Sequence, residues 1–226
     1  MRQILLLVMA TILIMGYGMQ NAGYEIPEEI IIVKGPSKEP HNPYQEEYEK
    51  LLYPTVRISA GFSTGSGVII DDYILTAAHV VGDESEVTIE FYPDVSTSCL
   101  RAFVAITDTV KDLALLRVKS DSLFKAALAP RNYTPYIFTP VYTVGCSLGL
   151  NPRPSQGIIS VIEKDHWEIA SPILPGNSGG PVYDARTYQV IGIAVWVKTY
   201  QGQLVTTMAG IVTIQDIHAF LAQANK

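Results

Sequence analysis

The chain has 226 residues, of which 48% are hydrophobic and 17% are charged. This composition supplies enough apolar side chains for one packed domain or two small half-domains, and it argues against a disordered chain. The formal net charge is -6, and lysine and arginine form no run, so the basic footprint of a nucleic-acid-binding protein is missing. We therefore expect no nucleic-acid partner.

The N-terminus carries one cation, Arg2, followed by an uncharged apolar run from Ile4 to Met15. A run of this length is typical of a signal peptide and is short for a helix that spans a bilayer. We therefore expect residues 1–23 to direct export to the periplasm, the cell envelope or the exterior. A retained membrane anchor over residues 4–19 is the alternative, with a buried core helix less favoured. A proline-broken linker is expected over 24–43, ahead of a folded domain over 44–226.

A short helix is predicted at the start of this domain. Asn42 can cap it, Pro43 can occupy its first turn, and Pro54 ends it. Its packing face would hold four large side chains, Tyr44, Tyr48, Leu51 and Leu52.

Short β-branched and aromatic runs, separated by Gly, Pro, Asn and Asp, occupy the chain from Thr55 to Val212. This pattern predicts an all-β sandwich or barrel, and two small barrels fit the length. The runs are TVRISA, SGVII, YILTA, EVTIEFY, LRAFVAI, LALLRV, VYTVG, GIISVI, VIGIAVWV and LVTTMAGIV.

A second helix is predicted at the C-terminal end. Thr213 and Asp216 have the spacing of a capping box, although Asp replaces the preferred Glu or Gln. Ile214, Ile217 and Leu221 then form one helical stripe. We expect this helix to pack over the second barrel.

The chain has two cysteines, Cys99 and Cys146. They could form a disulfide in an oxidising compartment, but two separate buried thiols are at least as consistent with the sequence. No Cys or His pair has zinc-site spacing and no P-loop occurs, so no metal or nucleotide cofactor is expected.

Two isolated residues are candidates for chemistry. His79 follows an apolar strand and the small pair Ala77 and Ala78, a suitable place for a general base, although a structural histidine is the commoner outcome. Asp112 immediately precedes the apolar run LALLRV, where it is either a turn residue or a carboxylate that orients an imidazole. Asp108 is a weaker rival, and the other three histidines, His41, His166 and His218, lack a comparable context.

The stretch ILPGNSGGPVYD, residues 173–184, is the third candidate. Gly176, Gly179 and Gly180 permit unusual backbone angles, so the N–H groups of Gly176 and Ser178 could converge on one oxygen. A plain Gly/Asn/Ser turn between two strands explains the same composition.

Taken together, TAAHV with His79, DLALL with Asp112 and GNSGGP with Ser178 resemble the trypsin-like, chymotrypsin-fold serine peptidases. The resemblance is strongest to their HtrA/Deg branch, and it covers roughly 55–217. Three further segments match, GSGVII, VGCSLGLNPRPSQGIIS and VIGIAVWV. It implies an all-β fold of two six-stranded antiparallel barrels, with a short N-terminal and a C-terminal helix and the site in the cleft between the barrels.

The resemblance also implies an activity, that of a serine endopeptidase. Ser178 would attack a peptide carbonyl, and His79 would take its proton and return it to the leaving amine. Asp112 would hold the imidazole, while the backbone N–H groups of Gly176 and Ser178 would form an oxyanion hole.

Specificity is also implied by the resemblance, which places Ile173, Val195, Trp196 and Val197 along the pocket for the substrate side chain before the cut. No aspartate lies among them, so a small aliphatic side chain is expected there rather than Lys or Arg. Unfolded or exposed polypeptides are the expected substrates. Asn177 stands where digestive relatives carry the aspartate that pairs with a freshly cut N-terminus, so activation by that route is not expected.

HtrA proteins usually carry a PDZ domain after the protease domain, and only nine residues follow Ile217, so we expect a protease domain alone. A homo-oligomer through Tyr44, Tyr48 or Tyr53 remains open, since these residues are equally explained by helix packing. Two other functions are kept as alternatives: a latent or inactive protease-fold binding protein, and a β-rich surface protein with accidental matches.

Overall fold

The computed structural model describes residues 42–92, 99–117, 124–164 and 166–224. The expected leader over 1–23 and nearly all of the expected linker lie outside these residues. Within the described part of the chain, no helix is long and apolar enough to cross a membrane.

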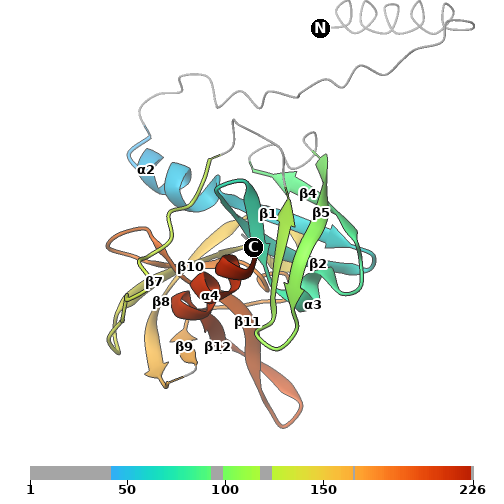
Figure 1. The fold of residues 1–226 in the computed structure, drawn as a ribbon. Helices are drawn as coiled ribbons and strands as arrows, with labels where there is room; N and C mark the ends of the chain where they lie inside the picture. Colours follow the sequence, from blue (N-terminus) through green and yellow to red (C-terminus); the bar gives the residue numbers. More distant parts are fainter. Residues whose placement is uncertain (1–41, 93–98, 118–123, 165, 225–226) are drawn as a thin grey trace, which may run out of the picture. The chain divides into compact units, whose positions relative to one another are not determined.

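The described strands form two closed antiparallel barrels of six strands each (Figure 1). The first has the order β1-β2-β3-β6-β5-β4 and the second the order β10-β11-β12-β9-β8-β7. This confirms the predicted fold. The first barrel consists of β1 (Thr55–Ala60), β2 (Ser63–Ile70), β3 (Tyr73–Thr76), β4 (Glu86–Phe91), β5 (Cys99–Asp108) and β6 (Leu113–Arg117). The second consists of β7 (Pro140–Gly145), β8 (Arg153–Ile162), β9 (Trp167–Ala170), β10 (Pro181–Asp184), β11 (Val190–Tyr200) and β12 (Gln203–Thr213).

Alternation explains why these runs close into barrels. In β1, Val56, Ile58 and Ala60 point into the first core, and the two residues between them are more exposed. β2, β3 and β6 are apolar on both faces because their second face packs against the other barrel. Val68 and Leu115, for example, belong to the core cluster that contains the interior of the second barrel.

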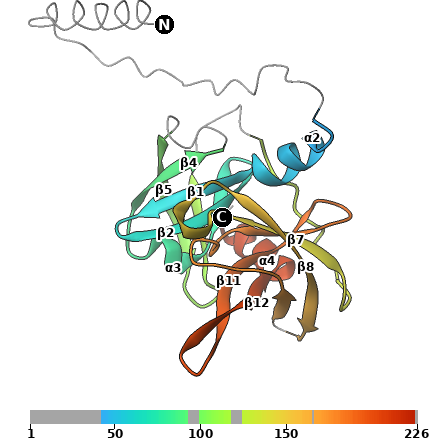
Figure 2. The ribbon, with the colours of Figure 1, turned by 180° about the vertical axis from the view of Figure 1, so that it is seen from behind.

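The two barrels are also joined by the segment between them. Ala126 N–H donates to the carbonyl of Ile69 in the first barrel at 2.8 Å, and Ala129 N–H donates to that of Val190 in the second at 2.9 Å. Seen from behind, the barrels again lie side by side, and the β11–β12 hairpin projects from the second (Figure 2). The connection therefore contributes to barrel docking through its backbone.

The N-terminal helix is shorter and less regular than predicted. It consists of α2 (Gln45–Glu47) followed by one π-helical turn, η1 (Tyr48–Leu52). The predicted cap was wrong: Asn42 Oδ1 accepts a hydrogen bond from Tyr44 N at 3.0 Å in a turn ahead of the helix, whereas Tyr44 occupies the N-cap position and its side chain makes no cap bond. The prediction was wrong for Tyr44, which is 64% exposed and lies off the packing face. The π turn shifts the register, so that Leu51 and Leu52 are the buried residues.

The C-terminal helix, α4 (Ile214–Ala224), begins with the predicted cap. Thr213 Oγ1 accepts from Asp216 N at 3.3 Å and donates to Asp216 Oδ2 at 3.1 Å. Ile214 and Ile217 are buried as expected, together with Phe220, which the stripe did not include. α4 packs on β11 and β12 of the second barrel, as predicted, and also contacts β5 of the first.

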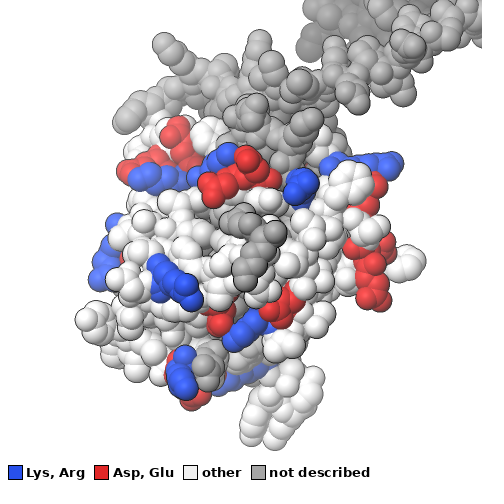
Figure 3. Space-filling view, viewed as in Figure 1, with Lys and Arg blue, Asp and Glu red and all other residues white. Residues whose placement is uncertain are grey.

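Charges of both signs lie next to one another on the face seen in Figure 3. Among the described residues, charges of opposite sign form local pairs, such as Lys50 with Glu46 at 2.6 Å and Lys111 with Asp216 at 2.8 Å. The outer part of the β11–β12 hairpin, at the lower edge of this view, is uncharged.

Candidate active site

His79 and Asp112 form a directly bonded pair. His79 lies on α3 (Ala78–Val81), where the chain leaves β3, and Asp112 lies in the turn between β5 and β6. His79 Nδ1 is 2.7 Å from Asp112 Oδ2, and His79 N donates to Asp112 Oδ1 at 2.9 Å. Because the carboxylate accepts the Nδ1 proton, Nε2 of the neutral ring carries a lone pair.

The turn that holds Asp112 is built by the rival candidate. Asp108 Oδ1 accepts hydrogen bonds from Val110 N at 3.0 Å and Lys111 N at 2.9 Å, so Asp108 acts as a turn residue. Asp112 has a φ of 54°, a left-handed conformation that Asp tolerates better than most residues. Lys111 is tied to Asp216 at the start of α4, so the C-terminal helix buttresses this turn.

A tight turn precedes Ser178. Asn177 N donates to the carbonyl of Leu174 at 3.0 Å, and Gly176 has a φ of 97°. Proline followed by a residue of positive φ at the two central positions is typical of a type II turn, which explains the sequence LPGN. Ser178 follows this turn directly.

The backbone N–H groups of this loop divide into two sets. Those of Asn177, Gly179 and Gly180 donate to the carbonyls of Leu174, Ala194 and Asn177. Those of Gly176 and Ser178 have no hydrogen-bond partner among the described residues. These are the two donors that the sequence indicated, and unpaired N–H groups in a half-buried loop are uncommon.

The Ser178 loop belongs to the second barrel but lies directly against the first. A Cβ on Gly179 would be 2.2 Å from Thr76 Oγ1 and 2.9 Å from Ala77 N, so the loop touches the turn that leads into α3. The carbonyl of Ser178 accepts from Ser66 N on β2 at 2.8 Å. The fold thus brings Ser178 to the same barrel interface as His79. No hydrogen bond joins Ser178 Oγ to His79 within the described residues.

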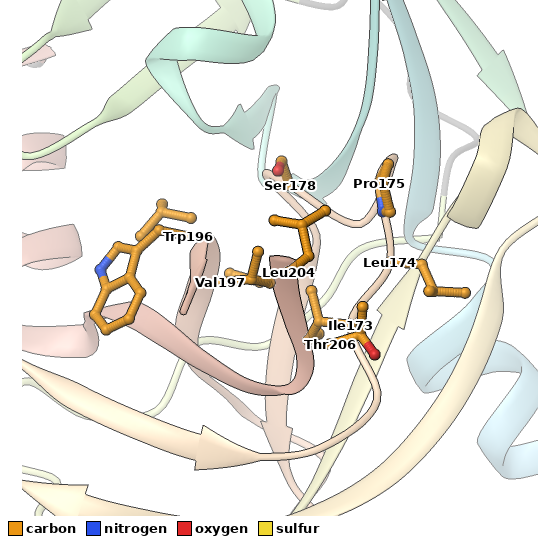
Figure 4. A pocket seen from close by; sticks show the side chains of 10 residues that line it. Ile173, Leu174, Pro175, Ser178, Trp196, Val197, Leu204 and Thr206 are labelled. Atoms are coloured by element: carbon orange, nitrogen blue, oxygen red, sulfur yellow. The ribbon is translucent and has the colours of Figure 1, made fainter. Parts of the chain in front are cut away.

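An apolar pocket of about 170 Å³ opens beside Ser178 (Figure 4). The four predicted pocket residues, Ile173, Val195, Trp196 and Val197, all line it. Five more line it as well, namely Leu174, Pro175, Ala194, Leu204 and Thr206. No carboxylate or other charged side chain lies among these residues.

Leu204 and Thr206 reach the pocket because β12 bulges. Val197 pairs with Ala209, whereas the next residue, Lys198, pairs with Val205, so three residues of β12 loop out. The carbonyl of Thr206 accepts from Ile173 N at 2.7 Å, which closes the hairpin onto the opposite wall. The apolar pattern of the run LVTTMAGIV does not indicate this bulge, so the sequence analysis did not predict Leu204 and Thr206 as pocket residues.

The charged residue next in β11 turns away from the pocket. Lys198 Nζ pairs with Glu168 Oε2 at 2.8 Å, and His166 Nε2 lies 3.3 Å from Glu168 Oε1. Burial alone would raise the pKa of Glu168, but hydrogen bonds from Lys198 and His166 outweigh it and lower the pKa. The Trp196 indole lies 6.1 Å from the His166 ring and points away from Val197 and Leu204 (Figure 4).

Cys146 is a free, buried thiol, which answers the open question of a disulfide for this residue. Burial raises its pKa to about 12, so the thiol stays protonated and is a poor nucleophile. The described residues contain no group of three or more His, Cys, Asp or Glu side chains that could hold a metal ion.

Comparison with known proteins agrees with this arrangement. Residues 65–193 match the trypsin-like peptidase domain model. A protein named probable periplasmic serine endoprotease DegP-like, from Pseudomonas fluorescens, is 32% identical over 150 residues, which are 62% of this chain and 30% of that protein. The magnetosome formation protease MamE of Paramagnetospirillum magneticum is 30% identical over 150 residues, covering 61% of this chain and 20% of that protein. The chain therefore spans less than a third of the length of these relatives.

Solved structures share the fold. The serine endoprotease from Yersinia pestis superimposes with a TM-score of 0.70 at 22% identity, covering 82% of this chain and 68% of that chain. The HtrA-type protease AlgW gives a TM-score of 0.70 at 21% identity, covering 81% and 63%. Since the family model matches more than half of the residues, the chain belongs to the trypsin-like peptidase family, with the two-barrel chymotrypsin fold of its HtrA/Deg branch.

Proposed function

We propose that the chain is a serine endopeptidase in which Ser178 attacks the peptide carbonyl. His79 Nε2 takes the Ser178 proton and returns it to the leaving amine, while Asp112 orients the ring and stabilises the imidazolium. The acyl-enzyme is then hydrolysed by water through the same base. The N–H groups of Gly176 and Ser178 stabilise the oxyanion in both steps.

The observation that carries this proposal is the state of the two backbone donors. Gly176 and Ser178 keep N–H groups with no partner among the described residues beside an apolar pocket, although the N–H groups of Asn177, Gly179 and Gly180 are bonded. Such an arrangement costs stability unless an oxygen from outside the protein accepts these bonds. The His79–Asp112 pair, with its free Nε2, adds the base that a serine nucleophile requires.

For substrates, we infer unfolded or exposed polypeptides with a small aliphatic side chain before the cut. The support is the apolar lining of Ile173, Val195 and Val197 and the uncharged pocket. The relatives named periplasmic support export, with cleavage of the leader or its retention as an anchor left to experiment. A homo-oligomer that forms through these N-terminal tyrosines is also a hypothesis. Tyr44 is exposed and so is available for a contact with another subunit, whereas Tyr53 is buried within the chain.

A latent or inactive protease-fold binding protein is the second candidate, because Ser178 Oγ makes no hydrogen bond to His79 in the described residues. Bonds of this kind are often long in unliganded enzymes and shorten when substrate binds. The missing bond is therefore consistent with both an active and a latent enzyme, and the experiment below distinguishes them.

The test uses the full chain and its Ser178→Ala variant with an unfolded model protein. Mass spectrometry identifies the cut sites, and a serine-directed phosphonate reports on Ser178. Cuts made only by the unmutated chain, with labelling at Ser178, would support the proposal. Labelling without cuts would favour the latent form, and cuts made equally by both chains would remove Ser178 as nucleophile.

A further inference from the structure

We propose that Arg57 is a positioning residue for the oxyanion donor Gly176, acting through the loop of residues 146–150. The inference rests on the proposed function. Arg57 belongs to β1 of the first barrel, and the loop follows β7 of the second. Neither Arg57 nor Glu90 lines the pocket or bonds to His79, Asp112 or Ser178.

The first step concerns the peptide between Pro175 and Gly176. Leu148 N donates to the carbonyl of Pro175 at 2.7 Å. In a planar trans peptide the C=O and N–H point in opposite directions, so this bond turns the Gly176 N–H away from Leu148. If the peptide rotated, a carbonyl would replace the donor on the reacting side.

The second step concerns the loop that supplies the Leu148 N–H. Leu148 has a φ of 57° and a ψ of 27°, and Gly149 has a φ of 71°. A leucine rarely adopts this left-handed conformation, and its side chain is 67% exposed, so burial does not stabilise it. Other contacts must hold the loop in this conformation.

Arg57 provides such a contact. Its Nη1 donates to the carbonyl of Gly149, and its Nε and Nη2 bond to the two oxygens of Glu90, the Nε at 3.2 Å from Oε1. Arg57 and Glu90 are register partners on β1 and β4, with side chains only 23% and 15% exposed. The bidentate pair with Glu90 fixes the orientation of the guanidinium, so that the remaining donor, Nη1, faces the carbonyl of Gly149.

Ser66 on β2 acts beside it. Its hydroxyl accepts from Cys146 N at 2.7 Å and donates to the carbonyl of Gly176 at 2.6 Å. The first barrel thus holds both ends of the connection, the loop at Cys146 and Gly149 and the turn at Gly176. A contact between barrels would then set the orientation of one catalytic donor.

The test compares Arg57→Met with Arg101→Met in the full chain. Arg101 pairs with Glu86 at 2.9 Å in the same barrel and makes no contact with the loop among the described residues, so it is a control for the loss of an Arg–Glu pair at a more exposed position. We expect Arg57→Met to lower kcat on a peptide substrate about 10- to 1000-fold, where the upper limit is the effect of losing one oxyanion donor completely. KM should change less than about threefold. Arg101→Met should change neither.

Rescue separates positioning from general stability. Asn tolerates left-handed angles better than Leu, so adding Leu148→Asn to Arg57→Met should recover part of kcat. An unchanged kcat in Arg57→Met would overturn the proposal. So would a loss of kcat that merely follows the unfolded fraction, measured by circular dichroism, and that Leu148→Asn does not restore.

Amide hydrogen exchange keeps the two proposals distinct. Faster exchange at Leu148 in Arg57→Met, but not in Arg101→Met, would support the link even if the unmutated chain proved inactive and the proposed function failed. Unchanged exchange at Leu148 would overturn the link whatever the activity.

Discussion

Replacing Gly176 by alanine perturbs the turn before Ser178 at its most constrained point. Gly176 has a φ of 97°, and a Cβ there would lie 2.5 Å from the carbonyl oxygen of Cys146 and 3.0 Å from Leu148 N. Both neighbours are backbone atoms in a bonded loop, so neither can move aside easily. The variant can keep the turn under strain or rotate the Pro175–Gly176 peptide.

The magnitudes favour rotation. Keeping a non-glycine residue in this region costs about 1–3 kcal/mol before the contact with Cys146 is counted. Rotation of the peptide relieves both the backbone strain and the contact with Cys146, but it removes one oxyanion donor. Loss of one such donor typically lowers kcat about 100- to 1000-fold, which is an increase of roughly 2.7–4 kcal/mol in the activation barrier. KM should change little, because the apolar pocket is left intact.

The assay is steady-state cleavage of a peptide with an aliphatic residue before the cut, with thermal unfolding measured in parallel. Gly202→Ala is the control, since Gly202 has a φ of 77° and open space around its Cα. It carries comparable backbone strain, and no described atom lies within 4 Å of the added Cβ. An undiminished kcat in Gly176→Ala, or an equal loss in Gly202→Ala, would refute the assignment of Gly176 as a donor.

Three further predictions concern Asp112, Asp184 and Leu204. Asp112→Asn should lower kcat about 10,000-fold at neutral pH, measured by peptide cleavage, because the amide cannot hold the required tautomer of His79. Asp184→Asn should lower the free energy of unfolding by about 1.5–3 kcal/mol in urea at pH 7, because the buried carboxylate accepts bonds from Arg186 and Tyr133. Burial alone would raise the pKa of Asp184, but these bonds outweigh it and lower the pKa, so the stabilisation is complete above the unfolded-state value of about 4 and is lost as pH falls below it. The two chains should therefore unfold at closer urea concentrations at pH 3 than at pH 7, and an unchanged gap would contradict the pairing. Leu204→Ala should widen the pocket and shift the cut sites in an unfolded protein towards larger apolar side chains, whereas an unchanged cleavage pattern would exclude Leu204 as a wall.

The strands were predicted well where their apolar pattern is long or alternating. The ten predicted runs correspond to ten strands, and β1 has the predicted bounds. β9 and β10 were not named as runs. β9 has four residues and contains Glu168, a buried carboxylate that pairs with Lys198 and His166. β10 starts with a proline directly after the glycine turn, so local signals indicate a loop rather than a strand.

The sequence pattern predicted which residues form the candidate site, but it did not predict their contacts. The order of His79, Asp112 and Ser178 was enough to suggest one cleft, and the His79–Asp112 bond agrees with it. The wall formed by Leu204 was missed because it depends on a register shift in β12. Hydrophobic periodicity indicates which face of a strand is buried, and it gives no information about where the pairing slips.

What the pattern could not reveal is the way one barrel shapes the site of the other. Arg57 contacts Gly149 and Ser66 contacts Gly176 across 92 and 110 positions of the sequence. Nothing local distinguishes these two side chains from the other polar residues of a half-exposed strand, because their partners are backbone carbonyls, which every residue possesses. Only barrel docking selects the carbonyls that they meet. The conformation of the Gly176 turn therefore depends on contacts between the barrels, whose docking also buries Val68 and Leu115 of the first barrel in the core cluster of the second.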